Sequence, residues 1–171
     1  INQYDIVYLG NSNPRLTGGA GLNVSYKQFK LSAIFYGRYG QDVVNATRLN
    51  NESMRGIDNQ STAVLRRWRN EGDQTDIPRA LYGEGYNTLG FDRFVEDASY
   101  LRLKSLSFTY RLPKKAIQRW GFNNIDVYVT GYNLFTWTKY TGQDPEVKTE
   151  NTYARDTATT PASIQLVAGF N

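Results

Sequence analysis

The side chains of this sequence that could perform acid–base chemistry are carboxylates in polar stretches. Asp73 and Asp76 form one pair, and Asp92, Glu96 and Asp97 form a second group. Two carboxylates about 5 to 9 Å apart are what glycoside hydrolysis requires. The surrounding sequence offers nothing to bury them and raise a pKa. We therefore interpret them as solvated loop charges, and calcium binding in the loops stays open although no EF-hand pattern is present.

Composition excludes most other catalytic chemistry. The sequence contains no histidine and no cysteine, which rules out Ser-His-Asp triads, thiol nucleophiles, disulfide frameworks and the usual zinc sites. The glycine-rich run at 18–21 neither follows a strand nor opens a helix with the spacing of a nucleotide-binding fingerprint. We expect no catalytic residue, no cofactor and no resident metal, so the chain is not predicted to be an enzyme.

A second class of candidate residues combines aromatic rings with positive charge. The run Arg66-Arg67-Trp68-Arg69 and several tyrosines lie in or beside polar stretches. Exposed rings of this kind can stack on sugar rings or pack against a partner protein. Internal packing of the loops is the alternative interpretation. The candidate contact residues are Arg66, Trp68, Tyr82, Tyr86 and Tyr140.

The elements that would position these residues are predicted to be β-strands. The chain has 171 residues, enough for one domain core, and its net charge of +4 is too small for a typical nucleic-acid binder. Thirteen tyrosines, fifteen glycines and a single methionine favour β structure. No apolar run approaches the roughly 20 residues of a membrane helix. A transmembrane strand needs only about ten residues of alternating polarity, which agrees with a mean hydropathy of −0.57.

Alternation of apolar and polar residues at period two predicts five antiparallel strands. A short link joins the first two strands, and another follows Pro113, which ends the third. Two long polar connections separate the remaining strands, and the first of them contains a predicted short helix at 61–70. The predicted strands span about 16–26, 31–39, 98–112, 124–137 and 163–171, and the long connections span about 40–97 and 138–161.

This alternation of short and long connections is typical of an outer-membrane β-barrel, which has short periplasmic turns and long outer loops. A soluble β-sandwich is the alternative, because some sandwiches also gather long loops at one end. The sequence opens with Ile1 and shows neither an initiator Met nor a signal peptide. We interpret it as a processed or partial chain.

Several runs resemble the C-terminal part of SusC/RagA-type TonB-dependent transporters of Bacteroidetes outer membranes. The resemblance extends in order over nearly the whole chain. Its most specific blocks are DASYLRLKSL at 97–106 with LPKK at 112–115, and VYVTGYNLFT at 127–136 with KYTGQDPE at 139–146. LGNSNP at 9–14 and GQD at 40–42 agree with the same family.

The resemblance implies an all-β chain that forms the C-terminal section of a large, 22-stranded transmembrane barrel holding an N-terminal plug. It implies import of oligosaccharides or peptides, energy from TonB, and a SusD-like lipoprotein that closes the outer mouth as a lid. The expected partners are the rest of the barrel and plug, this lid, TonB, outer-membrane lipid and the substrate, but no nucleic acid. The plug, the TonB-binding segment and the N-terminal strands are absent from this sequence, so its first and last strands should pair with strands outside it.

The predicted strands assign side chains to lipid or to the barrel lumen. Rings at strand ends would form aromatic girdles at the bilayer interfaces: Tyr26, Tyr39, Tyr110, Phe135, Trp137 and Phe170. The expected lipid-facing residues are Leu106, Phe108, Tyr110, Ile125, Val127, Val129, Ile164 and Leu166. The expected lumen-facing residues are Ser105, Ser107, Thr109, Arg111, Asp126, Thr130 and Gln165.

Two further functions are weighed against the importer. A soluble extracellular β-sandwich would bind glycans through Trp68, Tyr82 and Tyr86, and it would be a water-soluble monomer. A glycoside hydrolase fragment would need its two carboxylates from the long connections. The sequence does not determine the substrate, the oligomeric state or whether the loops bind calcium.

Overall fold

The computed structural model describes residues 4, 6–83, 92–147, 149–150, 153–158 and 160–171. The chain divides into two compact units. Residues 14–40, 99–139 and 161–171 form one, here called the sheet unit. Residues 1–13, 41–98 and 140–160 form the other, called the loop unit. Most of each long polar connection lies in the loop unit, and most residues of the predicted strands lie in the sheet unit.

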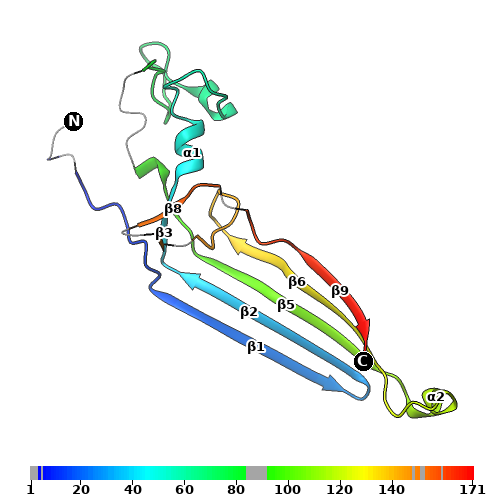
Figure 1. Cartoon of the computed structure of the whole chain (residues 1–171). Helices are drawn as coiled ribbons and strands as arrows, with labels where there is room; N and C mark the ends of the chain where they lie inside the picture. The colour runs from blue at the N-terminus through cyan, green and yellow to red at the C-terminus, as the bar shows by residue number, and fades with distance from the viewer. Residues whose placement is uncertain (1–3, 5, 84–91, 148, 151–152, 159) are drawn as a thin grey trace. The chain divides into compact units, whose positions relative to one another are not determined.

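The sheet unit is built around a five-stranded antiparallel sheet with the order β1-β2-β5-β6-β9 (Figure 1). Its strands are rich in β-branched and aromatic residues that fit a pleated surface. Their bounds lie within three residues of the predicted ones: β1 Leu16–Tyr26, β2 Phe29–Tyr39, β5 Tyr100–Arg111, β6 Asp126–Thr138 and β9 Gln165–Phe170.

The turn between β1 and β2 is tighter than the predicted link of residues 27–30. Tyr26 is already paired with Phe29, so only Lys27 and Gln28 lie between the strands. Lys27 has a positive φ of 52°, as a two-residue hairpin loop requires. Gln28 also accepts a backbone hydrogen bond from Arg111 of β5 at 2.8 Å. The shorter turn leaves fewer backbone groups without a partner.

The connection between β5 and β6 contains two short helical elements that the sequence did not indicate. Pro113 precedes α2 (Lys114–Ile117), which continues into η5 (Gln118–Trp120). Gly121 then adopts a left-handed conformation, φ 78°, the usual end of such a turn. None of the helices in the described ranges is both long enough and apolar enough to cross a membrane.

The loop unit has more regular structure than two polar connections suggest. Its small sheet has the order β4-β3-β8-β7, in which β3 and β8 are parallel. The predicted helix at 61–70 is the shorter 3-10 element η2. The strands of the small sheet are too short for a period-two pattern to reveal them. The elements are β3 Asp42–Asn45, α1 Ala46–Asn51, η2 Thr62–Arg66, η4 Asp92–Phe94, β4 Val95–Asp97, β7 Thr149–Glu150 and β8 Tyr153–Asp156.

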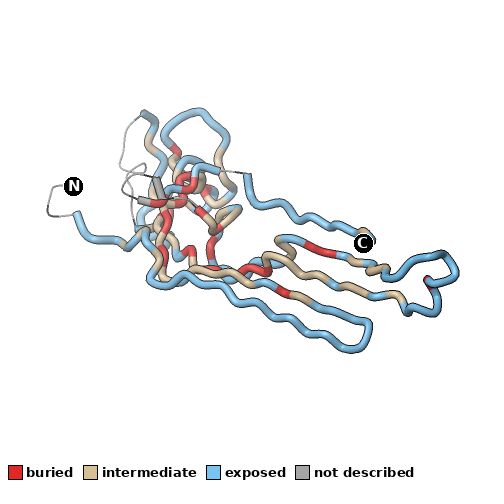
Figure 2. The backbone as a smooth tube through the Cα atoms, turned by 60° about the horizontal axis from the view of Figure 1, so that its bottom comes forward, coloured by how far each residue is buried: buried red, intermediate tan, exposed pale blue. Residues whose placement is uncertain are grey.

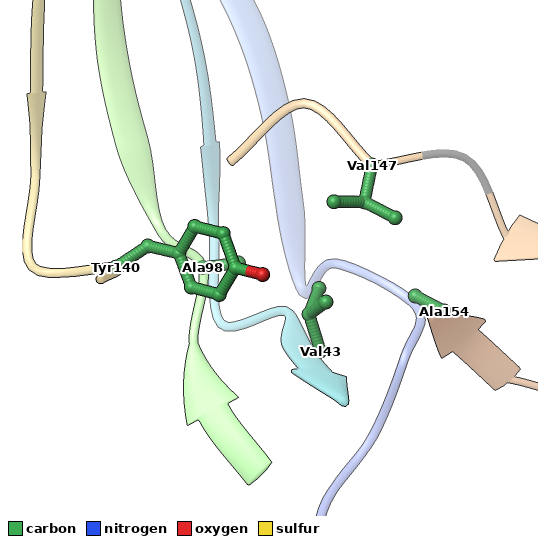
Figure 3. Packing of buried hydrophobic residues seen from close by; sticks show 5 residues of the cluster. All are labelled: Val43, Ala98, Tyr140, Val147 and Ala154. Atoms are coloured by element: carbon green, nitrogen blue, oxygen red, sulfur yellow. The ribbon is translucent and has the colours of Figure 1, made fainter. Parts of the chain in front are cut away.

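A small core joins segments of the loop unit that are far apart in sequence. Figure 3 shows the Tyr140 ring beside Ala98, with Val43, Val147 and Ala154 around them. Tyr140 is 6 % exposed, and its hydroxyl donates to Oδ2 of Asp156 at 2.6 Å. A second cluster contains Met54, Val64 and Ile77. Buried segments of the loop unit contrast with β1, which is exposed along its whole length (Figure 2).

Replacing Tyr140 with Phe should loosen this core. The substitution keeps the ring but leaves the buried Asp156 carboxylate without its hydroxyl donor, which typically costs about 1–3 kcal/mol. We expect faster hydrogen exchange at the amides of β3 and β8, measured by mass spectrometry. The matched control Tyr82→Phe, at a side chain that is 80 % exposed, should leave exchange unchanged. Equal protection in both variants would contradict the structural role of the Tyr140 hydroxyl.

Candidate functional site

The two faces of the five-stranded sheet differ in chemistry. Residues directly opposite one another on antiparallel strands point to the same face, so the register assigns every paired side chain. Three successive rows define an apolar face: Leu22–Ala33–Leu106–Gly131–Leu166, Val24–Leu31–Phe108–Val129–Ala168 and Tyr26–Phe29–Tyr110–Val127–Phe170. All paired positions of this sheet are described, and no charged side chain among them lies on the apolar face.

The opposite face is polar and carries the charges of the sheet. Ser107 and Thr130 share a hydroxyl–hydroxyl hydrogen bond at 2.8 Å. Arg111 and Asp126 form a two-point ion pair, with Nε–Oδ1 at 2.8 Å and Nη2–Oδ2 at 2.9 Å. The sequence placed these four side chains on one face but did not indicate that they bind one another. Two rows of this face are Asn23–Ser32–Ser107–Thr130–Val167 and Ser25–Lys30–Thr109–Tyr128–Gly169.

A β-bulge at Lys104 preserves the separation of the two faces. Strict alternation from Leu106 would put Lys104 on the apolar face. The register shifts there, so that Leu103 rather than Lys104 lies opposite Phe35. The ammonium group of Lys104 instead lies 5.7 Å from the ring centroid of Tyr36, a residue of the polar face. The bulge therefore keeps a charge off the apolar face and places Leu103 on it.

The neighbouring strand β6 contains a matching irregularity. Asn133 and Leu134 together stand opposite Lys104, and Asn133 has a positive φ of 53°. A Cβ atom added at Gly131 would lie 2.7 Å from Leu134 Cδ2. A side chain at position 131 would therefore require the Leu134 side chain to move.

Aromatic rings border the apolar face at both ends. At one end, Phe29 stacks on Tyr110 with centroids 4.8 Å apart. At the other end, Phe135 stacks on Trp137 with centroids 6.1 Å apart. The exposed fractions are 66 % for Tyr26 and 82 % for Phe170, and Tyr39, the last residue of β2, is also exposed. The six predicted girdle residues thus fall into two groups, Tyr26, Tyr110 and Phe170 at the first end and Tyr39, Phe135 and Trp137 at the second.

The structure also places the residues that were predicted to face lipid or lumen. Leu106, Phe108, Tyr110, Val127, Val129 and Leu166 share the apolar face, and Ser105, Ser107, Thr109, Arg111, Asp126, Thr130 and Gln165 share the polar one. Ile125 and Ile164 lie one residue before β6 and β9, outside the paired register. The Ile125 carbonyl accepts a hydrogen bond from Leu112 at 2.9 Å.

The candidate contact residues of the loop unit have different environments. Arg66 is exposed at the end of η2, and its carbonyl accepts a hydrogen bond from the Thr75 hydroxyl. Trp68 is half-buried, and its amide donates to the Ile77 carbonyl at 2.9 Å. Tyr82 is 80 % exposed, and Tyr86 lies outside the described residues. Tyr140 differs from the expectation of a contact residue, because core packing leaves it only 6 % exposed.

Glu96, interpreted from sequence as a solvated charge, is instead the centre of a polar network. Its side chain is 12 % exposed and lies 3.2 Å from Nη1 of Arg48. The Thr141 amide and hydroxyl donate to Oε2 at 3.0 and 2.7 Å. Burial alone would raise the pKa of Glu96, but these hydrogen bonds and the Arg48 guanidinium outweigh it and lower the pKa below its ordinary value. Glu96 therefore joins the 40–97 segment to residue 141.

Two other carboxylates of the sequence-predicted groups accept hydrogen bonds from nearby backbone amides. Asp73 accepts backbone hydrogen bonds from Arg69 and Asn70, both at 2.9 Å, which lower its pKa and cap a turn. Asp92 accepts from the amide of Arg93 at 2.8 Å. Among the described residues, no three His, Cys, Asp or Glu side chains gather closely enough to hold a metal ion.

Protonation of Glu96 should destabilise the loop unit at acidic pH. A carboxyl group whose pKa is lowered on folding stabilises the fold above its unfolded pKa, near 4.5. It loses that contribution as the pH falls through the lowered value. We expect exchange at the amides of β3 and β4, corrected for intrinsic rates, to accelerate as the pH falls below the ordinary glutamate pKa of 4.5.

Glu96→Gln should remove this pH dependence and speed exchange at neutral pH, with a loss of about 1–3 kcal/mol. The control Glu71→Gln, at an exposed position, should behave like the unmodified protein. A Glu96→Gln variant with an unchanged acid transition would show that other groups cause it.

Comparison with known proteins identifies the family to which this chain belongs. No family model matches the chain. TonB-dependent receptor P3 of Formosa agariphila is 34 % identical over 151 residues, which cover 88 % of this chain and 15 % of the receptor. TonB-dependent receptor P26 of the same organism is 35 % identical over 146 residues, covering 85 % and 15 %. The chain therefore spans about 15 % of the length of these relatives.

Solved structures of the RagAB peptide importer resemble the fold. In the closed-closed state the TM-score is 0.78 with 33 % identity, covering 93 % of this chain and 17 % of that chain. In the open-open state the TM-score is 0.75 with 32 % identity over the same shares. Sequence and fold agree with the resemblance carried by the blocks at 97–115 and 127–146. The chain belongs to the SusC/RagA-type TonB-dependent transporters.

Proposed function

We propose that this chain forms part of the wall and outer loops of a TonB-dependent importer in the outer membrane. The observation that carries the proposal is the uncharged apolar face between two groups of aromatic rings. From the row of Val127 to that of Trp137, a strand rises about 33 Å, at about 3.3 Å per residue. Tilted by about 40°, as in barrels of this kind, it spans about 25 Å, which is the height of the apolar band of an outer-membrane barrel.

The sheet would be one section of a 22-stranded barrel with a plug. In the described sheet β1 is paired with β2 and β9 with β6, so each has one edge available for another strand. An unpaired strand edge in lipid leaves its backbone polar groups unsatisfied at a cost of several kcal/mol. The remaining strands of the transporter would satisfy them, and the polar face would line the lumen.

The loop unit would lie on the outer side and meet a SusD-like lipoprotein lid. The long connections leave the sheet at Tyr39 and Thr138, which are near each other because Arg38 and Thr138 both pair with Tyr100. The short turns lie at the other end, which agrees with the asymmetry of outer-membrane barrels. Arg66, Trp68 and Tyr82 are the proposed lid or ligand contacts.

Peptides and oligosaccharides are the two substrate classes that we consider. The RagAB structures are those of a peptide importer, which supports peptides for this chain. The apolar face argues against a soluble glycan-binding sandwich, since a soluble monomer rarely exposes so large an uncharged surface. TonB would supply energy through a part of the transporter outside this sequence.

A charge on the apolar face should impair membrane assembly in a depth-dependent way. Val129→Arg places a guanidinium toward the middle of the band and should cost about 2–4 kcal/mol, whereas Val127→Arg, nearer the aromatic boundary, should cost less. The measurement is the amount of heat-modifiable, folded transporter in the outer membrane. Tyr132→Arg, two residues along β6 from Thr130 on the polar face, is the control and should assemble normally. Normal assembly of Val129→Arg would contradict lipid contact by this face.

Removal of the exposed loop side chains should weaken the lid. A double Arg66→Ala, Tyr82→Ala variant of the full-length transporter should bind its lipoprotein about 5- to 30-fold more weakly, which corresponds to a loss of about 1–2 kcal/mol for the two interface side chains together. Affinity would be measured by biolayer interferometry in detergent. Phe122→Ala removes an exposed aromatic of the sheet unit and serves as the control. Unchanged affinity of the double variant would remove these residues from the contact.

A further inference from the structure

Positive charge is concentrated at the end of the sheet unit that carries the short turns. Residues 24–30, 110–127 and 170–171 meet there through the β1–β2 turn, the β5–β6 connection and the end of β9. All of these residues are described, and Asp126 is the one acidic side chain among them. Because Asp126 is paired with Arg111, five cations remain in excess: Lys27, Lys30, Lys114, Lys115 and Arg119.

Three of these cations share the β5–β6 connection with two exposed aromatic rings. Trp120 is 72 % exposed and Phe122 is 53 % exposed, whereas Ile117 of the same connection is fully buried. Ile117 therefore anchors the connection, and the left-handed turn at Gly121 separates the two exposed rings. Lys114, Lys115 and Arg119 are exposed beside them.

The connection is continuous with the apolar face of the sheet. β5 enters it directly from Tyr110 and Arg111, and β6 leaves it through Asp126 and Val127. Tyr110 and Val127 belong to the row that ends in Tyr26 and Phe170. Trp120 and Phe122 thus lie in the connection that follows the Arg111–Asp126 pair, beyond the aromatic row, and Lys114, Lys115 and Arg119 lie in the same connection.

Rings and cations in this order match the chemistry of a membrane surface. Tryptophan and similar amphipathic rings favour the level of the lipid headgroups. Lysine and arginine extend their charged ends toward the phosphates while their methylene stems cover apolar surface. Each basic side chain near an anionic membrane surface adds to the attraction between protein and membrane. A neutral headgroup would not account for three cations in a connection, residues 112–125, that contains no acidic side chain.

We propose that the β5–β6 connection binds anionic phospholipids at the short-turn side of the membrane. Trp120 and Phe122 contact the boundary between headgroups and acyl chains, and Lys114, Lys115 and Arg119 bind the headgroup phosphates. This inference rests on the proposed insertion of the sheet in a membrane. Insertion of the barrel does not by itself require an anionic lipid or a site that binds it. The inference adds both.

The first test measures the lipids that stay bound to the full-length transporter. The protein would be reconstituted in nanodiscs of phosphatidylcholine and phosphatidylglycerol, released in mild detergent, and examined by native mass spectrometry. We expect phosphatidylglycerol to be enriched among the bound lipids. In a Lys114→Gln, Lys115→Gln, Arg119→Gln variant this enrichment should be at least about tenfold lower. The control removes three exposed charges elsewhere: Arg55→Gln, Arg69→Gln and Lys139→Gln. An equal loss in both variants, or no enrichment in the unmodified protein, would overturn the proposal.

A second test needs only a conservative variant and so does not depend on the triple variant folding. Lipids brominated near the headgroup end of their chains quench a nearby tryptophan, so the difference in quenching between the unmodified transporter and Trp120→Phe reports the position of Trp120. We expect a clear difference, together with weaker phosphatidylglycerol enrichment at high salt, which screens exposed charges. Absence of quenching at Trp120 would indicate a protein partner instead and overturn lipid contact. A transporter that inserts without these signals refutes this inference alone, whereas one that does not insert refutes the proposed function as well.

Discussion

The pairing register of five antiparallel strands is the constraint on which the rest of the sheet depends. It gives backbone N–H and C=O groups their partners and at the same time decides which face each side chain occupies. A slip of one residue between β5 and β6 would exchange Phe108 with Ser107 and bring Arg111 onto the apolar face. In a membrane such a slip would turn charged side chains of β5 toward the lipid. Under the proposed membrane insertion, the need for an uncharged face therefore constrains the register in addition to hydrogen bonding.

The bulge at Lys104 shows how this requirement is met when the sequence departs from simple alternation. Leu101 and Leu103 occupy odd positions, whereas Leu106, Phe108 and Tyr110 occupy even ones. All of them lie on one face because one extra residue shifts the phase. On β6 the irregularity contains two extra residues, so odd-numbered residues lie on the apolar face both before and after it. Gly131 makes room there for Leu134. Local irregularity in both strands thus preserves one continuous apolar surface.

The loop unit is held together by a different kind of interaction. Its apolar core is small, and polar contacts connect its three chain segments. Glu96 accepts from Thr141, and the Arg48 guanidinium forms ion pairs with Glu96 and with Glu52, at 3.2 and 2.8 Å. The Asn45 side chain caps α1 by accepting from the Arg48 amide at 2.9 Å. Charged groups of this kind are costly to bury singly but stable when each has its partners, so the loops can be rich in polar residues and still adopt one structure.

Five strands and the two faces of the sheet could be predicted from the sequence, because period-two alternation is a local property that each strand displays by itself. The absence of histidine and cysteine likewise excluded most catalytic centres without a structure. The family resemblance also followed from ordered runs of residues. The environments of single loop side chains did not follow. Tyr140 and Glu96 look like exposed polar-loop residues in sequence, but Tyr140 is buried and Glu96 is largely shielded from solvent.

Tertiary structure alone decided those positions, because their partners are distant in the chain. Tyr140 is covered by Val43 and Ala98 and bonded to Asp156, and Glu96 is bonded to Arg48 and Thr141. No periodicity encodes contacts between segments separated by tens of residues. The phase shift at Lys104 belongs to the same class, since a bulge is defined only against the strands beside it. The alternation of apolar and polar residues can be read from the sequence of each strand by itself. The burial and ion pairing of loop residues depend on where the folded chain brings its remote segments together.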